Sequence, residues 1–196
     1  MYLIRHGITE GNQRRFYYGK TDLPLIEEEK RAIKERVKAG IYPVAEGLSF
    51  VTSGLLRTEE TLFEIYGTVS HIADERLNEI DFGDFEMKSY EELKDREDYQ
   101  EWISGDNWAN VCPNGESGEQ MDSRAFPALK EYADKDVFIV CHGGIISSWM
   151  QSLFPDDNEH QNFYEWTPKP CEGYKIVFED GKAKKYQKIG LKKAVG

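Results

Sequence analysis

The sequence has 196 residues, which is enough for one domain with a hydrophobic core of its own. Its 25 basic and 36 acidic side chains give a net charge of −11, which disfavours nucleic acid and anionic membranes as partners. No apolar run approaches the length of a membrane span. Because Met1 leads directly into the first expected strand, we expect no signal peptide and a cytoplasmic protein.

Three cysteines are present, which is an odd number without any C-x-x-C pair. Cys112, Cys141 and Cys171 are therefore expected to be reduced thiols and not a disulfide framework. Cysteine and histidine do not cluster with the spacing of a zinc site, so we expect no metal.

The N-terminal half alternates apolar runs with helical periodicity. Tyr2-Leu3-Ile4 is expected to be a buried strand, and residues 11–22, rich in Gly, Asn and Arg, a loop. Apolar residues then recur at helical spacing from Leu25 to Val37, before Gly40. Strands are expected at 48–52 and 69–72, with a helix between them that is capped by Ser53 and ends at Gly67.

The C-terminal half contains a change of composition and then a second alternation. Residues 81–118 are polar and rich in Tyr, Trp, Asn and Gly, with a capping box that begins at Ser89, and we interpret them as an inserted lid. A helix is expected at 119–132, where Pro127 could introduce a kink, a buried strand at 137–141, and a helix from Ile145 to Leu153. Asp180-Gly181 predicts a β-hairpin.

Together these elements predict an α/β fold, with a mainly parallel sheet flanked by helices on both faces. A small inserted lid (81–118) and a C-terminal β-hairpin complete a single expected domain of residues 1–196.

Two strand ends carry the same short pattern. Arg5-His6-Gly7 and Cys141-His142-Gly143 each place a histidine and then a glycine after an apolar strand. Ligands bind at this edge of open α/β sheets, and glycine lets a ligand approach the backbone closely. If the two strands are neighbours, His6 and His142 face one pocket; a single such histidine would more often be structural.

Arg57 is expected in the first turn of its helix, which is an unfavourable position for a cation. Two interpretations remain open. Arg57 is either a solvated surface arginine, or it binds an anion together with the positive end of the helix dipole.

The run Arg5-His6-Gly7-Ile8-Thr9-Glu10-Gly11-Asn12 resembles the opening signature of the histidine phosphatase superfamily, the phosphoglycerate mutase-like proteins. Further elements of the family pattern follow in order, over residues 2 to about 150: Gly19, Asp22-Leu23-Pro24-Leu25, Ser53 to Arg57, Leu77-Asn78-Glu79, Phe82-Gly83, Gly115-Glu116-Ser117 and His142-Gly143-Gly144.

The resemblance implies a catalytic site for phosphoryl transfer. His6 would be the nucleophile that becomes phosphohistidine, while Arg5, Arg57 and His142 would bind the phosphoryl oxygens. Glu79 would protonate the leaving group; several acidic residues crowd the same segment, and Glu116 is the alternative acid. Asn12 and Gly143 would contact the phosphate. The chemistry is consistent with these roles, since phosphoryl transfer needs positioning and charge neutralisation that arginine forks can supply without metal.

Three departures from the family pattern concern the substrate and not the reacting groups. Met87 stands where the family usually has glycine, Ile145-Ile146-Ser147-Ser148 lacks an arginine that many members carry, and residues 168–174 lack an asparagine-containing pattern. The substrate therefore remains open.

We expect the lid and the loop Phe16-Tyr17-Tyr18 to roof the substrate pocket. The lid's aromatic residues would either line that pocket or merely hold the lid together. They are Tyr90, Tyr99, Trp102 and Trp108.

The sequence thus predicts a metal-independent phosphatase without a cofactor, which hydrolyses a small phosphorylated metabolite through phosphohistidine. Two alternatives are a cofactor-dependent phosphoglycerate mutase and a non-catalytic phosphate-binding module. The oligomeric state is not predicted.

Overall fold

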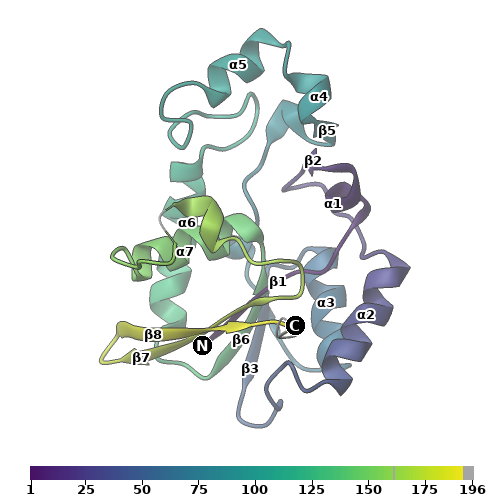
Figure 1. Cartoon of the computed structure of the whole chain (residues 1–196), viewed down its shortest axis with the longest axis vertical. Coiled ribbons are helices and arrows are strands. Elements are labelled where there is room, and N and C mark those ends of the chain that lie inside the picture. The colour runs from purple at the N-terminus through teal and green to yellow at the C-terminus, as the bar shows by residue number, and fades with distance from the viewer. Residues whose placement is uncertain (161, 192–196) are drawn as a thin grey trace.

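A six-stranded sheet forms the centre of the molecule (Figure 1). The computed structural model describes residues 1–160 and 162–191. The strand order is β4-β3-β6-β1-β7-β8. Their bounds are β1 (Tyr2–Arg5), β3 (Ser49–Thr52), β4 (Ile72–Ala73), β6 (Val137–Cys141), β7 (Gly173–Glu179) and β8 (Lys182–Ile189). Neighbours among β4, β3, β6 and β1 pair in parallel, whereas β7 and β8 pair antiparallel. The predicted mainly parallel sheet and C-terminal hairpin are confirmed.

Helices cover both faces of this sheet, as predicted, with α6 and α7 on one side and α2 and α3 on the other (Figure 1). The cause is visible in β6, where Val137, Ile139 and Cys141 face the α6/α7 core while Phe138 and Val140 face the α2/α3 core. Side chains of a strand alternate between faces, so an all-apolar strand requires cover on both. The bounds are α2 (Glu27–Lys38), α3 (Leu56–Tyr66), α6 (Gly118–Tyr132) and α7 (Gly143–Leu153).

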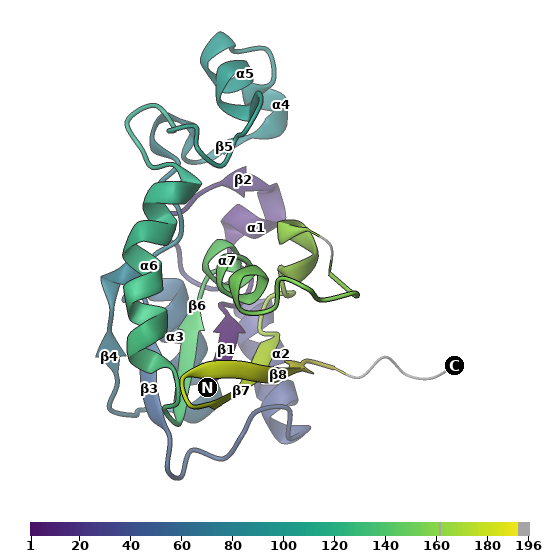
Figure 2. The ribbon, with the colours of Figure 1, turned by 90° about the vertical axis from the view of Figure 1, so that its left-hand side faces the viewer.

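The segment interpreted as a lid rises above the carboxyl ends of β1 and β6 (Figure 2). It contains β5 (Lys88–Ser89), α4 (Tyr90–Leu93) and α5 (Glu97–Ile103), and Ser89 forms the predicted capping box. Phe85, Leu93, Tyr99 and Cys112 form a small separate core in it. The lid is joined to the N-terminal segment because β5 pairs with β2 (Phe16–Tyr17).

Three local predictions are wrong. Residues 11–22 are not only a loop, since α1 (Glu10–Arg14) and β2 lie there, and α1 begins with a capping box between Thr9 and Asn12. The third strand is displaced toward Ile72–Ala73. Ser53 does not cap α3, which begins at Leu56, because the Ser53 hydroxyl is hydrogen-bonded to Thr58 and His142 instead.

The remaining described elements are short 3₁₀ helices: η1 (Glu75–Leu77), η2 (Gly83–Phe85) and η3 (Phe163–Trp166). Pro127 lies within α6 and does not end it. Cys112, Cys141 and Cys171 are buried free thiols. Within residues 1–160 and 162–191, no helix is long and apolar enough to cross a membrane.

Met87 has a φ of 59°, and this is the position where the family usually has glycine. A left-handed conformation costs an L-residue about 1–2 kcal/mol, and replacement by glycine would remove this cost. Glycine's greater conformational freedom in the unfolded chain would offset about 0.4–1 kcal/mol of that gain in stability. Met87→Gly should therefore raise the free energy of unfolding in urea by about 0.5–1 kcal/mol. Asp180→Gly, at φ 50°, should give a smaller gain because aspartate tolerates this region. A lower stability of Met87→Gly would contradict the strain argument.

Candidate active site

His6 directly follows β1, and its position is fixed by the sheet. Its backbone N–H donates to Cys141 O on the neighbouring strand at 3.0 Å. The imidazole Nδ1 lies 2.7 Å from Gly7 O. A carbonyl can only accept, so Nδ1 carries the proton and Nε2 keeps its lone pair. The ring is almost buried, at 4% exposure, and presents an unprotonated nitrogen suited to nucleophilic attack.

His142 lies beside His6, as predicted from the two strand ends. β1 and β6 are neighbours, with Arg5 opposite Cys141, and the two imidazole centres are 5.2 Å apart. His142 is the N-cap residue of α7. Its Nδ1 accepts a hydrogen bond from Arg57 Nε at 3.3 Å, so Nε2 carries the proton and donates to Ser53 Oγ at 2.8 Å.

Arg57 is completely buried, which excludes the interpretation as a solvated surface arginine. Besides His142, its guanidinium donates to Thr21 O at 2.9 Å and to Gly19 O at 2.6 Å. Its carbon lies 5.0 Å from the centre of the Tyr18 ring. Three of its five N–H donors are used in this way, and two remain for a ligand.

Arg5 approaches the same region from the end of β1. One of its terminal nitrogens donates to Pro168 O at 2.9 Å, whereas its Nε is buried without a partner among the described residues. An unpaired buried donor costs free energy, so this position favours a bound acceptor. A Cβ on Gly143 would lie 3.4 Å from Arg5 Nε and 3.2 Å from the Thr167 methyl group, so the glycine keeps the approach open.

Glu79 is held with its carboxylate against the start of α7. Its Oε2 accepts from Gly144 N at 2.9 Å, and a Cβ on Gly144 would come within 2.3 Å of Oε1. The alternative acid, Glu116, forms a two-point ion pair with Arg124, at 2.7 and 2.8 Å. Arg124 in turn donates to Glu79 O at 3.0 Å. Glu116 therefore positions the Glu79 segment through Arg124. The role of Glu79 as proton donor stays a prediction.

Asn12 lies in α1, where its carboxamide oxygen accepts from Thr9 N at 3.0 Å. Its amide nitrogen has no hydrogen-bond partner among the described residues and is available to an anion. Phosphate contact by Asn12 and by Gly143 stays a prediction.

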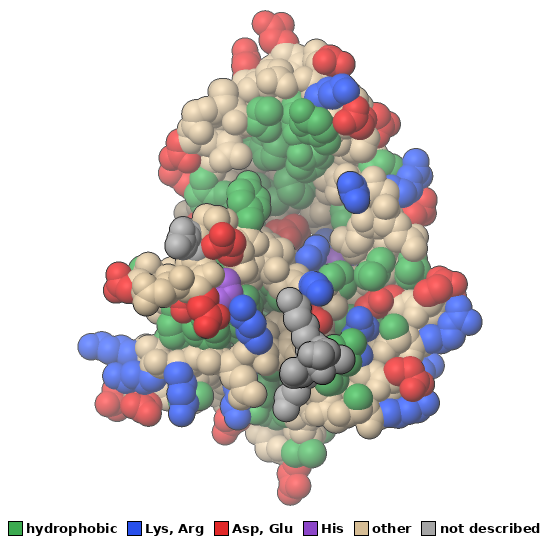
Figure 3. All heavy atoms as spheres, in the orientation of Figure 1, with side chains coloured by type: hydrophobic (Ala, Val, Ile, Leu, Met, Phe, Trp, Pro, Cys, Tyr) green, Lys and Arg blue, Asp and Glu red, His purple; other side chains and the backbone are tan. Residues whose placement is uncertain are grey.

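A cavity of about 280 Å³ opens beside Arg5, Glu79, Gly143 and Gly144. His6 and His142 are not among the residues that line this cavity, although their sequence neighbours Arg5 and Gly143 are. Figure 3 shows a hollow below the lid, with hydrophobic side chains gathered above it. The aromatic side chains that line the cavity are Tyr17, Phe82, Trp102, Trp108, Phe163 and Tyr164.

The aromatic residues of the lid divide between the two roles considered for them. Trp102 and Trp108 line the cavity, Tyr99 belongs to the lid's own core, and Tyr90 is 52% exposed. Phe163 and Tyr164 were not anticipated. They come from η3, in a region where no helical or strand periodicity was apparent, and only the tertiary fold brings them to the cavity.

The charges of the site are local. Arg5 and Arg57 have no carboxylate within ion-pair distance among the described residues. The partly buried Arg36 and Arg124, in contrast, are paired with Glu29 and Glu116. Within residues 1–160 and 162–191, no group of three or more His, Cys, Asp or Glu side chains could hold a metal ion. The arrangement is a focused positive pocket within an acidic protein, which is suited to an anion.

Both histidines are held neutral. Burial, followed by the positive charges of Arg57 and Arg5, keeps the pKa of His6 well below its ordinary value. Burial, then Arg57 and His6, does the same to the pKa of His142. A neutral His6 keeps its nucleophilic lone pair in mildly acidic solution.

These shifts predict a pH dependence of stability. The folded-state pKa of each histidine is depressed, so the stability of the neutral forms is fully present above about pH 6.5, the unfolded value, and is lost as the pH falls from there toward the folded pKa. Each histidine should contribute about 1.4 kcal/mol per pH unit in that window. Urea unfolding at several pH values gives the change of unfolding free energy with pH, which measures the protons taken up on unfolding. In His6→Asn this uptake should be smaller by about one proton, and an uptake equal to that of the wild type would contradict the assignment.

Glu86 is a residue whose importance the sequence did not reveal. Its Oε1 accepts from the backbone N–H of Gly19 at 2.7 Å and of Lys20 at 3.1 Å. Its Oε2 accepts from the backbone N–H and the hydroxyl of Thr21, at 3.1 and 2.5 Å. Gly19 and Thr21 are the residues whose carbonyls hold Arg57, so Glu86 fixes the loop that positions the guanidinium.

Glu86→Gln should therefore weaken the binding of inorganic phosphate by about tenfold, ~1.4 kcal/mol, because an amide offers one acceptor oxygen to donors that now share two. Isothermal titration measures this affinity. Glu92→Gln is the matched control, since Glu92 accepts from the backbone and hydroxyl of Ser89 in the lid, away from Arg57. Equal affinity loss in both variants would refute a specific role for Glu86.

Known proteins with similar sequences and structures include several phosphatases. The uncharacterized phosphatase PhoE of Bacillus subtilis is 31% identical over 170 residues, covering 82% of this chain and 80% of PhoE. The adenosylcobalamin/α-ribazole phosphatase of Salmonella typhimurium is 29% identical over 157 residues, covering 75% of each chain. The solved structure of the α-ribazole phosphatase from Shigella flexneri superposes with a TM-score of 0.77 at 26% identity, covering 93% of this chain and 92% of that one. Phosphoglycerate mutases also match.

The family assignment agrees with the fold and with the resemblance in the sequence motifs. A sequence model of the histidine phosphatase superfamily (branch 1) matches residues 1–188, which includes the carboxyl ends of both β1 and β6. The chain belongs to the histidine phosphatase superfamily.

Proposed function

We propose that this protein is a phosphatase that hydrolyses a small phosphomonoester through a phosphohistidine on His6, without a metal ion. One observation carries the proposal: the guanidinium groups of Arg5 and Arg57 have no carboxylate partner among the described residues, and they flank a neutral imidazole that has a free lone pair. A phosphate dianion supplies the missing negative charge, and arginine forks match its oxygens.

The proposed reaction has two steps. In the first, His6 Nε2 attacks phosphorus, the bond from phosphorus to the ester oxygen breaks, and protonated Glu79 gives its proton to the leaving oxygen. In the second, water attacks the phosphohistidine while Glu79 takes a proton from it. The phosphorus–nitrogen bond then breaks, and inorganic phosphate leaves with His6 neutral again. Arg5, Arg57 and the His142 region stabilise the charge on the transferring group.

The matching phosphatases support hydrolysis, and the aromatic lining of the cavity suits a leaving group that carries a ring. A small phosphorylated metabolite therefore remains the proposed substrate. Nucleic acid and membranes are not proposed as partners, in keeping with the net charge of −11, and the cytoplasmic location stays a prediction.

A phosphoglycerate mutase is the second candidate, because mutases are among the matching proteins. A mutase must keep water from the phosphohistidine while its substrate reorients, which requires a sealed site. A non-catalytic module is disfavoured, since Arg5, His6, Arg57, Glu79 and His142 are all present and lie at one edge of the sheet.

Phosphorus-31 NMR separates these functions. With para-nitrophenyl phosphate we expect phosphate release that persists in excess EDTA and is abolished in His6→Ala, together with an acid-labile phosphoryl adduct on His6 after rapid quenching. With 3-phosphoglycerate and catalytic 2,3-bisphosphoglycerate, phosphate should accumulate faster than 2-phosphoglycerate. Faster formation of 2-phosphoglycerate would establish the mutase instead, and loss of activity in EDTA restored by Mg²⁺ or Zn²⁺ would refute the metal-free mechanism.

A further inference from the structure

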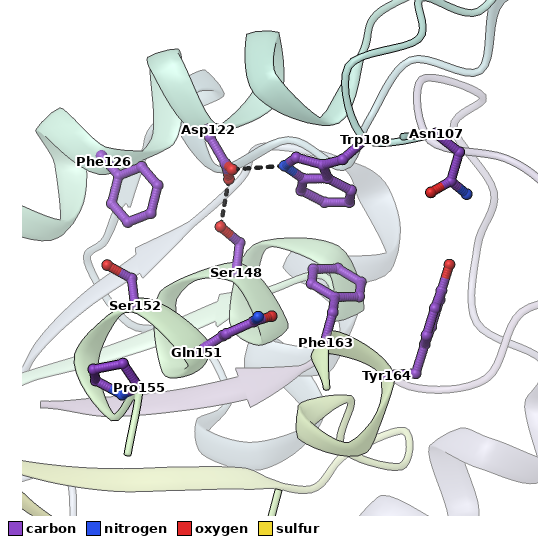
Figure 4. A pocket seen from close by; sticks show the side chains of 10 residues that line it. All are labelled: Asn107, Trp108, Asp122, Phe126, Ser148, Gln151, Ser152, Pro155, Phe163 and Tyr164. Carbon is purple, nitrogen blue, oxygen red and sulfur yellow. Dashed lines mark hydrogen bonds between the residues drawn. The ribbon is translucent and has the colours of Figure 1, made fainter. Parts of the chain in front are cut away.

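A second cavity, of about 500 Å³, lies next to the active-site cavity between α6, α7 and η3 (Figure 4). Four residues line both spaces: Asn107, Trp108, Phe163 and Tyr164. The two cavities therefore adjoin along a shared, mostly aromatic border. The active-site cavity alone, at about 280 Å³, is smaller than most small-molecule sites, which measure roughly 300–1,000 Å³.

Trp108 is the fixed residue of this shared border. The indole Nε1 donates to Asp122 Oδ2 at 2.9 Å, and the ring centre lies 4.7 Å from that of Phe163. The ring also packs against Gly118, where a Cβ would come within 2.1 Å of it. A ring fixed by these contacts gives both cavities a rigid apolar lining.

The side chains that line the second cavity offer a ligand few charged groups. The one acidic side chain in its described lining is Asp122, whose two oxygens accept from Trp108 and from the Ser148 hydroxyl (Figure 4). Lys, Arg and His are absent from the described lining. Gln151 and Ser152 line it from α7, and their side chains have no hydrogen-bond partner among the described residues. Aromatic walls with free amide and hydroxyl groups suit a ring with neutral polar substituents.

We infer that the second cavity binds the distal part of the leaving group, so that the substrate is an extended phosphomonoester with an uncharged, ring-bearing end. This rests on the proposed phosphatase function. The ester oxygen would lie near Glu79, the first part of the leaving group against Trp108, and the distal ring beyond it, near Phe126 and Ser152. A second phosphate or a carboxylate at that end is disfavoured, because the described lining contains no cation and Asp122 would repel it.

Three aryl phosphates with similar leaving groups test this inference: 4-methoxyphenyl phosphate, 4-(benzyloxy)phenyl phosphate and 4-(carboxymethoxy)phenyl phosphate. All release an alkoxyphenolate, so differences in kcat/KM report binding beyond the first ring and not the chemistry of the leaving group. We expect kcat/KM for the benzyloxy compound to exceed that for the methoxy compound about tenfold, and the carboxymethoxy compound to gain nothing.

Ser152→Trp, which fills the second cavity, should reduce this tenfold preference to less than twofold. Ser123→Trp is the matched control: Ser123 is an exposed serine of α6 that lines neither cavity, and this variant should keep the preference. Gln151→Phe provides a second filling variant if Ser152→Trp does not fold.

The outcomes are distinguishable. Equal kcat/KM for the methoxy and benzyloxy compounds, or a preference that survives in both filling variants, would overturn the inference while leaving the phosphatase intact. A gain for the carboxymethoxy compound would overturn the uncharged character of the cavity. If the protein hydrolyses none of the three compounds, the proposed phosphatase function itself would be overturned.

Discussion

The site depends on a buried cation that is held without being neutralised. Moving a guanidinium out of water costs several kcal/mol unless its N–H groups are satisfied. Arg57 meets this requirement with two backbone carbonyls, one imidazole nitrogen and an aromatic ring, all of them neutral. A carboxylate partner would have cancelled the charge. Neutral acceptors keep the guanidinium in place and leave its positive charge available to the proposed phosphate, even though the chain has a net charge of −11.

The same arrangement explains why distant segments converge on one edge of the sheet. Arg5 ends β1 and His6 directly follows it, His142 directly follows β6, and the turn after β3 leads into Arg57. The loop at 19–21 supplies the carbonyls for Arg57 and is itself fastened by Glu86, at the base of the lid. Hydrogen bonds therefore join the base of the lid, at Glu86, to the loop that holds Arg57.

The sequence predicted what depends on local pattern and on the topology of parallel sheets. His6 and His142 could be paired because each follows an apolar strand, and strands of that type end at a common edge. Ser53 was misassigned because its residue type suits an N-cap, whereas a long-range bond to His142 determines its role. Glu86 looked like one more solvated acid of an acidic segment, and Phe163 carried no periodicity. Both act through partners far away in the sequence, which local pattern does not reveal.

The substrate is a different kind of question from the reaction, and the structure separates the two. The groups proposed to face phosphorus are charged or titratable. Arg5, His6 and His142 lie at or directly after the ends of strands, and Arg57 lies in the first turn of α3. The groups proposed to face the leaving group are mostly aromatic and lie chiefly on the lid and on η3, outside the sheet. Loops on a rigid scaffold can change residue without disturbing the floor of the site. In Trp108 the two requirements meet, because a single ring, fixed by Asp122, forms a wall of the active-site cavity and of the cavity beyond it. The residues around Trp108 in both cavities should therefore determine which substrate binds, while the groups at the strand ends determine which reaction takes place.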